Sequence, residues 1–281
     1  LLCNKEIKFK SFLEHSLKLG ADFIATGHYV RKLSTPSGYK LLRGCDSNKD
    51  QSYFLCLLNQ YQLSKVIFPL GDMPKTEVKA LAKEIGLPNA NKKESMGICF
   101  VGKKNLKDFL GKYLNSTPGP IKTLEGKVKA KHLGLLHYTI GQRQGLGIGG
   151  PGEPWFVIGK DLENNTLFVQ QGEDALPLHS DQLHSQSFHW ITPLEDNFPI
   201  SCTAKFRYRQ QDQQVEVTPL GRHGICVSFK EPVKAVTPGQ AVVLYKEDQC
   251  LGGGTIDCVF FQGKRLLYAE GKSPQSTQIE F

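Results

Sequence analysis

The hydrophobic pattern of the chain changes near residue 115, and this change restricts the fold more than any other feature of the sequence. Before it, a helical pattern over "EIKFKSFLEHSLKLG" closes on Gly20 and leads directly into the short apolar run "ADFIATGH". A helix, a tight turn and a buried strand in that order are typical of a parallel α/β sheet. After it, short alternating runs are separated by Gly, Pro and Asn, which favours a β-barrel or sandwich.

Two segments rich in turn residues divide the chain further. They are "NSTPGP" at residues 115–120 and "TPLEDNFP" around residue 195. For 281 residues, two or three domains are the usual expectation. We therefore predict the end of an α/β domain over 1–115, a small central β-rich domain over 116–195 and a C-terminal β-barrel over 196–281. The absence of an initiator Met and the immediate helical pattern lead us to expect a truncated N-terminus.

Three helices are predicted in the first part of the chain. The first has an apolar face at helical spacing, and the second, "DMPKTEVKALAKEIGLP", has Pro74 near its start and Gly86 past its end. The third is a short helix over "NLKDFLGKYL", with Asn105 placed to cap it. The apolar face of the first helix consists of Phe9, Phe12, Leu13 and Leu17.

Gly27 and His28 follow the first predicted strand. Ligands of parallel α/β sheets bind beyond the carboxyl ends of the strands, so this position favours a ligand site. The alternative for His28 is an imidazole that only makes a local hydrogen bond at the strand end.

Charge is distributed unevenly along the chain. Residues 1–130 carry 22 Lys and Arg against 11 Asp and Glu, whereas residues 131–200 carry 3 against 8. A concentrated positive charge suits a polyanion such as RNA, and the alternative is that the lysines only keep the protein soluble. No apolar run reaches the roughly 18 residues of a membrane helix, and no signal peptide is recognisable, so we expect a soluble intracellular protein without membrane contact.

Two polar motifs could contact RNA. In "SNKDQSYFL", Lys49 could meet a phosphate and Gln51 a base edge, while Asp50 could simply cap the following helix. In "KFRYRQ", strand alternation would place three cations on one face and two aromatic rings on the other. Alternatively the rings are core and the charges are only solvated.

The segment "GQRQGLGIGGPG", residues 141–152, has neither a phosphate-loop nor a dinucleotide pattern. It is interpreted as a turn between strands, with a close approach to RNA as the alternative.

Cys99, in "ESMGICFVGKK", lies between lysines and follows Gly97. Nearby cations lower the pKa of a thiol and make it reactive, but an isolated cysteine is more often a core residue. None of the eight cysteines forms a Cys-x-x-Cys pair, so no metal site and no disulfide framework are predicted.

Taken in order, these segments resemble the tRNA-specific 2-thiouridylase family. The resemblance is carried by "LLCNKEIKFKSFL", "GADFIATGHYVRK", "LLRGCDSNKDQSYFL", "FPLGDMPKTEVKALA", "KKESMGICFVGKKN", "YTIGQRQGLGIGG", "KFRYRQQD" and "VTPGQAVVLY", and it extends from residue 1 to about residue 258. It implies an adenine-nucleotide α-hydrolase-like (PP-loop) α/β domain, followed by the two β-rich domains.

The resemblance implies a tRNA sulfurtransferase. ATP, with Mg²⁺, would adenylate the C2 oxygen of the wobble uridine, and a persulfide sulfur from a carrier protein would replace that oxygen. Cys99 would carry the persulfide, and Cys3 would be the second catalytic cysteine, closing a transient Cys3–Cys99 disulfide. Gly27 would contact ATP. The implied tRNA contacts are His28, Lys49, Asp50, Gln51, Arg207, Tyr208 and Gln240.

The Ser-Gly-Gly-x-Asp-Ser nucleotide loop of that family does not occur in the sequence. Residues 1–281 by themselves are therefore expected not to adenylate RNA and to be inactive. Two other functions stay open: another ATP-dependent adenylating enzyme of the same superfamily, and a non-catalytic RNA-binding protein. A monomer in the cytoplasm is expected, or in mitochondria if the source is eukaryotic.

Overall fold

The computed structural model describes residues 1–92, 109, 111, 113–114, 116–172, 176–193 and 197–273. The chain forms two compact units, each considered separately below. Unit 1 consists of Leu1–Lys92, His184–Lys230 and Gln240–Ile256, and unit 2 of Lys93–Leu183, Glu231–Gly239 and Asp257–Phe281. Cys99, Asn105 and nearly all of the third predicted helix lie outside the described residues. No helix among the described residues is both long and apolar enough to cross a membrane.

The first predicted helix has two parts. A π-helix, η1 (Cys3–Phe12), continues into α1 (Leu13–Lys18), and Gly20 closes it with a φ of 91°. Phe9 and Leu13 are buried, but Phe12 is 53% exposed, so its predicted place on the buried face is wrong. A π-helix bonds each N–H to the carbonyl five residues back and turns less per residue than an α-helix. Phe12 therefore has not yet returned to the side that Phe9 occupies.

The predicted parallel strands are present. β1 (Ile24–Ala25) pairs in parallel with β4 (Val66–Ile67), and Gly27 and His28 follow the carboxyl end of β1 as expected. Ile24 and Val66 point into the core, where they join Phe9 and Leu13.

Three further helices belong to unit 1. They are α2 (Ser52–Leu55), α3 (Gln60–Ser64), which begins with an Asn59 capping box, and α4 (Lys75–Glu84). The prediction for α4 is confirmed, because Pro74 precedes its first residue and Gly86, with a φ of 69°, follows its end.

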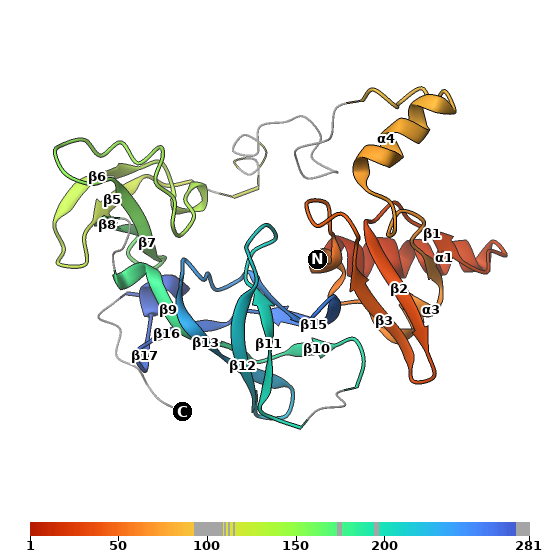
Figure 1. The fold of residues 1–281 in the computed structure, drawn as a ribbon. Helices are drawn as coiled ribbons and strands as arrows, with labels where there is room; N and C mark the ends of the chain where they lie inside the picture. The colour runs from red at the N-terminus through yellow and green to blue at the C-terminus, as the bar shows by residue number, and fades with distance from the viewer. Residues whose placement is uncertain are drawn as a thin grey trace. The chain divides into compact units, whose positions relative to one another are not determined.

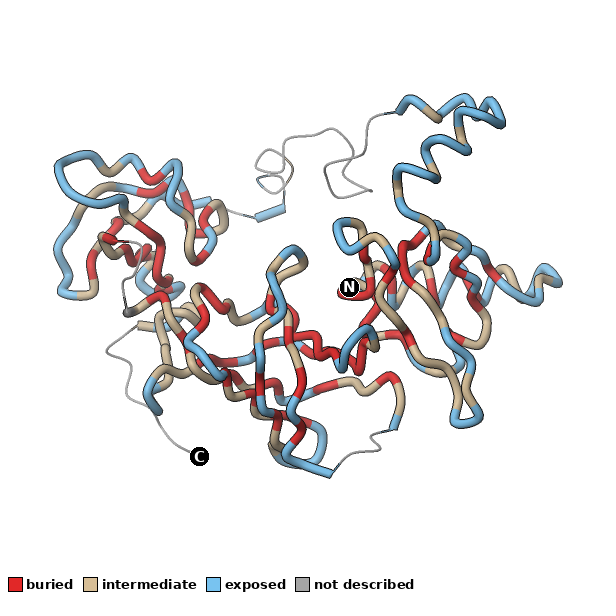
Figure 2. The backbone as a smooth tube through the Cα atoms, in the orientation of Figure 1, coloured by how far each residue is buried: buried red, intermediate tan, exposed pale blue. Residues whose placement is uncertain are grey.

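An antiparallel sheet connects the N-terminal segment of unit 1 to its two C-terminal segments (Figure 1). The hairpin of β2 (Val30–Thr35) and β3 (Gly38–Arg43) is joined to the C-terminal strands through the pairing of β3 with β15 (Gln249–Thr255). From β15 the sheet continues through β14 (Ala241–Lys246), β11 (Ile200–Lys205), β12 (Gln213–Leu220) and β13 (Gly224–Lys234), and β10 (Phe188–Trp190) also pairs with β15. Figure 2 marks the buried residues along these strands in red on the backbone.

The predicted strand over "KFRYRQ" is wrong beyond its first residue. β11 ends at Lys205, and residues 206–209 form a bend and a turn. The turn is closed by Phe206 N–H, which donates to Gln210 Oε1 at 2.9 Å, while the Phe206 ring is buried against Phe229. The predicted cationic and aromatic strand faces therefore do not exist.

Unit 2 contains a four-stranded sheet in the order β6-β5-β8-β7. Its strands are β5 (Gly119–Lys122), β6 (Val128–His132), β7 (Trp155–Asp161) and β8 (Thr166–Gln171). The Gly-rich segment 141–152 contains no strand and precedes β7, which confirms its interpretation as a turn. The remaining elements are the short helices Leu135–His137 (η2), Leu176–Leu178 (η3) and Leu267–Glu270 (η4), with strands β9 (His179–Ser185), β16 (Cys258–Phe261) and β17 (Lys264–Arg265).

Candidate functional site

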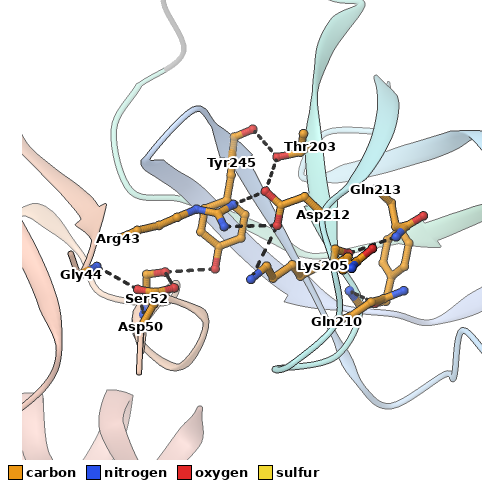
Figure 3. Close-up of polar contacts among 12 residues, drawn as sticks. Arg43, Gly44, Asp50, Ser52, Thr203, Lys205, Gln210, Asp212, Gln213 and Tyr245 are labelled. Carbon is orange, nitrogen blue, oxygen red and sulfur yellow. Dashed lines mark hydrogen bonds and ion pairs between the residues drawn. The ribbon is translucent and has the colours of Figure 1, made fainter. Parts of the chain in front are cut away.

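Asp50 is the buried anchor of the loop that precedes α2. Its Oδ1 accepts hydrogen bonds from the N–H groups of Gly44, at 3.0 Å, and Ser52, at 3.1 Å, and its Oδ2 accepts one from Ser52 Oγ at 2.8 Å (Figure 3). Asp50 therefore ties the start of α2 to Gly44, although the N-cap residue of the helix is Gln51, which makes no side-chain capping bond. Gly44 is required here, because a Cβ atom would lie 2.6 Å from the carbonyl oxygen of Tyr29.

Gln51 joins the same loop to the end of β1. Its Oε1 accepts from Tyr29 N–H at 3.0 Å, and its own N–H donates to Tyr29 O at 3.1 Å. Two segments predicted separately, Gly27-His28 and Lys49-Asp50-Gln51, are therefore adjacent. The Oε1 atom of Gln51 has this partner, and its second lone pair and the Nε2 amide group are the atoms with which the predicted base contact could be made.

His28 is buried within an aromatic cluster. Its ring centroid lies 5.6 Å from that of Phe9 and 6.5 Å from that of Phe68, and its Nδ1 lies 3.0 Å from Thr26 Oγ1. Burial, helped by the positive charge of Lys8, lowers the pKa of His28 to about 4. His28 is therefore neutral at pH 7, and the local hydrogen bond that was its alternative role is present.

Gly27 is exposed at the carboxyl end of β1. A Cβ atom added to it would meet only Leu70 Cδ1, at 3.7 Å, which is an ordinary contact. The packing of the chain therefore does not require a glycine here, and there is open space beside its Cα.

The 206–210 turn packs against α2 through its aromatic side chain. The Tyr208 ring lies 4.3 Å from Phe54 and 6.2 Å from Tyr53, measured between centroids. Burial lowers the pKa of the neighbouring Arg207 guanidinium, which Tyr53 partly opposes. The two polar motifs of the sequence, "SNKDQSYFL" and "KFRYRQ", thus meet at α2.

A pocket of about 530 Å³ opens between the two motifs. Its polar walls offer the cations Lys49, Lys205 and Arg209 beside the Tyr208 ring. Cations suit phosphate oxygens, and a half-exposed ring can stack on an unpaired base. The lining residues are Ser47, Asn48, Lys49, Asp50, Lys205, Tyr208, Arg209, Gln210 and Gln211, and we call this the α2 pocket.

Tyr53 connects α2 to the remaining predicted contact. Its hydroxyl donates to the carbonyl of Ala241 at 3.0 Å, and the preceding residue, Gln240, is exposed. The sequence motif drew attention to the polar residues before Tyr53 but not to Tyr53 itself. Lys205 and Arg209 were noticed only as members of a strand face, so their place in the pocket was also missed.

Cys3 lies at the start of η1 and is half-buried. Its neighbour Asn4 is buried and donates from Nδ2 to the carbonyl of Phe54 at 3.1 Å, so the first turn of η1 is attached to α2. Cys99 lies outside the described residues, and the predicted Cys3–Cys99 pairing is untested.

The cysteines that the structure describes are free thiols. Cys56 and Cys250 are fully buried, and burial raises the pKa of Cys56 to about 12, so these two are inert core residues. Within the described ranges, no three His, Cys, Asp or Glu side chains are grouped to bind a metal ion.

Three family models match consecutive parts of the chain. They are a tRNA methyl transferase HUP domain over residues 1–103, a tRNA methyl transferase PRC-barrel domain over 107–171 and an aminomethyltransferase β-barrel domain over 180–256. The chain is thus a three-domain protein of the HUP class with two barrel domains, which confirms the predicted order of an α/β domain and two β domains. The exact boundaries at 115 and 195 remain predictions.

Curated relatives identify the family more narrowly. The chain is 57% identical over 270 residues to the tRNA-specific 2-thiouridylase MnmA of Bacillus pumilus (strain SAFR-032), covering 95% of this chain and 73% of the relative. It is 55% identical over 268 residues to the tRNA-specific 2-thiouridylase MnmA 2 of Geobacillus kaustophilus (strain HTA426), with 95% and 72% covered. The chain belongs to the tRNA-specific 2-thiouridylase MnmA family, and the resemblance seen in the sequence is confirmed.

Proposed function

We propose that the protein transfers sulfur to tRNA and converts the C2 carbonyl of the wobble uridine to a thiocarbonyl. The observation that carries this proposal is the arrangement around α2. The helix is in direct contact with Tyr208, its Tyr53 binds the residue after Gln240, and its Phe54 carbonyl binds the residue after Cys3. A candidate RNA surface and a candidate reactive thiol thus share one short helix, as a reaction on an RNA base requires.

The RNA would bind through the α2 pocket. Lys49, Lys205 and Arg209 offer positive charge to phosphates, and Tyr208 offers a ring to an unpaired base. Arg207, Gln51 and Gln240 are proposed as further contacts at its edge. Asp50, which is buried and accepts hydrogen bonds from Gly44 and Ser52, would act chiefly by holding the loop.

ATP is proposed as co-substrate, with Mg²⁺, and its role would be to make the C2 oxygen a leaving group. Gly27 would lie against the nucleotide, since the space beside its Cα is open and it follows a parallel strand. His28, held neutral by burial, would keep this strand end ordered without adding a positive charge.

Sulfur transfer is proposed to use Cys99 and Cys3. Cys99 Sγ would receive a sulfur atom from a carrier protein as a persulfide, whose terminal sulfur attacks C2 as AMP leaves. The Cys3 thiolate would then attack Cys99 Sγ, and the breaking S–S bond would leave its electron pair on the sulfur attached to C2. A Cys3–Cys99 disulfide would remain, and an external dithiol would reduce it for the next turnover. We place this chemistry in the cytoplasm, or in mitochondria for a eukaryotic source, with a monomeric protein.

Replacement of Cys99 by Ser tests the proposal. In the intact enzyme, the Cys99→Ser variant should leave tRNA without 2-thiouridine in nucleoside mass spectrometry while binding tRNA as tightly as the parent enzyme. Cys45→Ser is the matched control, because Cys45 is an exposed free thiol of the same chain, and thiolation should persist. Continued thiolation by Cys99→Ser would reject the role of Cys99.

The same assay separates the other functions. An intact parent protein that binds tRNA but adds no sulfur would favour a non-catalytic RNA-binding protein. If the tRNA gained a methyl group in place of sulfur, the result would favour the methyl transfer named in the description of the HUP-domain family model.

A further inference from the structure

Arg43 and Asp212 form an ion pair beside the α2 pocket. Arg43 ends β3, and Asp212 follows the 206–210 turn. The guanidinium donates to both carboxylate oxygens, from Nη1 to Oδ1 at 3.2 Å and from Nη2 to Oδ2 at 2.6 Å (Figure 3). Such a two-point contact fixes orientation as well as distance. The end of β3 is thereby fixed to the segment that follows the 206–210 turn, and both lie within unit 1.

The pair belongs to a closed ring of contacts. The Arg43 guanidinium lies 3.9 Å from the centroid of the Tyr245 ring, and the Tyr245 hydroxyl lies 3.2 Å from Ser52 Oγ. Ser52 Oγ donates to Asp50, which also accepts from the N–H of Gly44, the residue after Arg43. The loop that contains Asp50 is part of this ring, and Asp212, which follows the 206–210 turn, is attached to it through Arg43 (Figure 3).

Asp212 also orients a cation of the pocket itself. Lys205 Nζ lies 3.6 Å from Asp212 Oδ1, and the side chains of Lys205 and Asp212 are 15% and 32% exposed. Thr203 Oγ1, at 3.3 Å from Oδ2, adds a further contact on the same carboxylate. With two cations bound to it, Asp212 presents little negative charge to a ligand in the pocket.

We propose that Asp212 is a positioning residue for RNA binding, which through Arg43 and Lys205 holds the two walls of the α2 pocket at the separation that a nucleotide of the RNA requires. This inference rests on the proposed function, because it assumes that the pocket binds tRNA. It concerns a residue that would not itself touch the RNA.

The proposal predicts that loss of the Asp212 carboxylate weakens RNA binding, which is the opposite of what net charge alone predicts. Removing a carboxylate raises the net positive charge, and charge alone would strengthen the binding of a polyanion. If Asp212 positions the pocket, its removal weakens binding instead. Arg43→Lys gives an independent test, because it leaves the net charge unchanged but loses the planar two-point contact and the stacking on Tyr245.

The experiment measures tRNA affinity, and KM and kcat for tRNA thiolation, in the intact enzyme with Asp212→Asn, Arg43→Lys and a control. If a misplaced pocket wall loses about one hydrogen bond to the RNA, the affinity changes about tenfold. Both variants should therefore raise Kd and KM for tRNA about tenfold and leave kcat within about twofold. The control is Asp248→Asn, which removes an equal charge from the 2.8 Å ion pair of Asp248 with Arg31 in the same unit. It should bind tRNA as tightly as the parent or more tightly.

The outcomes separate the inference from the proposed function. A parent protein that neither binds nor thiolates tRNA would overturn both. A parent that thiolates tRNA, with Asp212→Asn and Arg43→Lys binding it as tightly, would overturn only the positioning role. If Asp212→Asn fails to fold, Arg43→Lys alone decides, with circular dichroism to establish that it is folded.

Discussion

The buried imidazole of His28 should make the stability of the protein depend on pH. His28 is 9% exposed, packs against Phe9 and Phe68, and has its pKa lowered from 6.5 to about 4. The cause is first its burial and then the positive charge of Lys8. In the unfolded chain, by contrast, the imidazole is in water and takes up a proton at its ordinary pKa.

The sign and size follow from proton uptake. Above pH 6.5 His28 is neutral in both the folded and the unfolded protein, so its contribution to the free energy of unfolding does not change with pH. Between pH 6.5 and about 4 the unfolded chain binds a proton that the folded protein does not, so stability falls as pH falls. Each pH unit in this window lowers the free energy of unfolding by about 1.4 kcal/mol. About 2 kcal/mol of stability is therefore lost by pH 5, and about 3 kcal/mol by pH 4.

Urea unfolding at pH 7 and pH 5 measures this loss. The parent protein should lose about 2 kcal/mol more than His28→Gln over this interval, because glutamine does not titrate. His15→Gln, which replaces an exposed histidine of α1, should behave as the parent. Equal losses in the parent protein and His28→Gln would refute the argument that His28 is neutral because it is buried.

Two other predictions concern the contacts around α2. Asn4→Ala removes the bond from Asn4 to the half-buried Phe54 carbonyl, so the free energy of unfolding in urea should fall by about 1 kcal/mol; no change would mean that water replaces the amide. Tyr208→Ala should weaken tRNA binding about tenfold in fluorescence anisotropy, as expected for the loss of one stacking platform, whereas Tyr208→Phe, which keeps the ring against Phe54, should bind within about twofold of the parent. Equal affinity of the two Tyr208 variants would exclude stacking.

Local patterns in the sequence predicted the elements whose form depends on neighbours in the chain. Pro74 and Gly86 limited α4 correctly, and the apolar run ending at Gly27 gave the parallel strand. The alternation in "KFRYRQ" misled because the strand ends where Phe206 turns into the core and Gln210 closes the turn. The face of the first helix was misjudged at Phe12 because the α-helical period was applied to a π-helix.

By itself, the sequence determined the order of domains, the family and the residues worth attention, since motifs and hydrophobic periods are local properties of a chain. Only the tertiary structure decided how those residues combine. Asp50 proved to be an anchor, Asn4 attaches the Cys3 turn to α2, and Arg43 meets Asp212 across 169 positions of sequence. The physical reason is that hydrogen bonds and ion pairs depend on distance in space. Packing sets that distance, and it cannot be read from how far apart two segments are in the sequence.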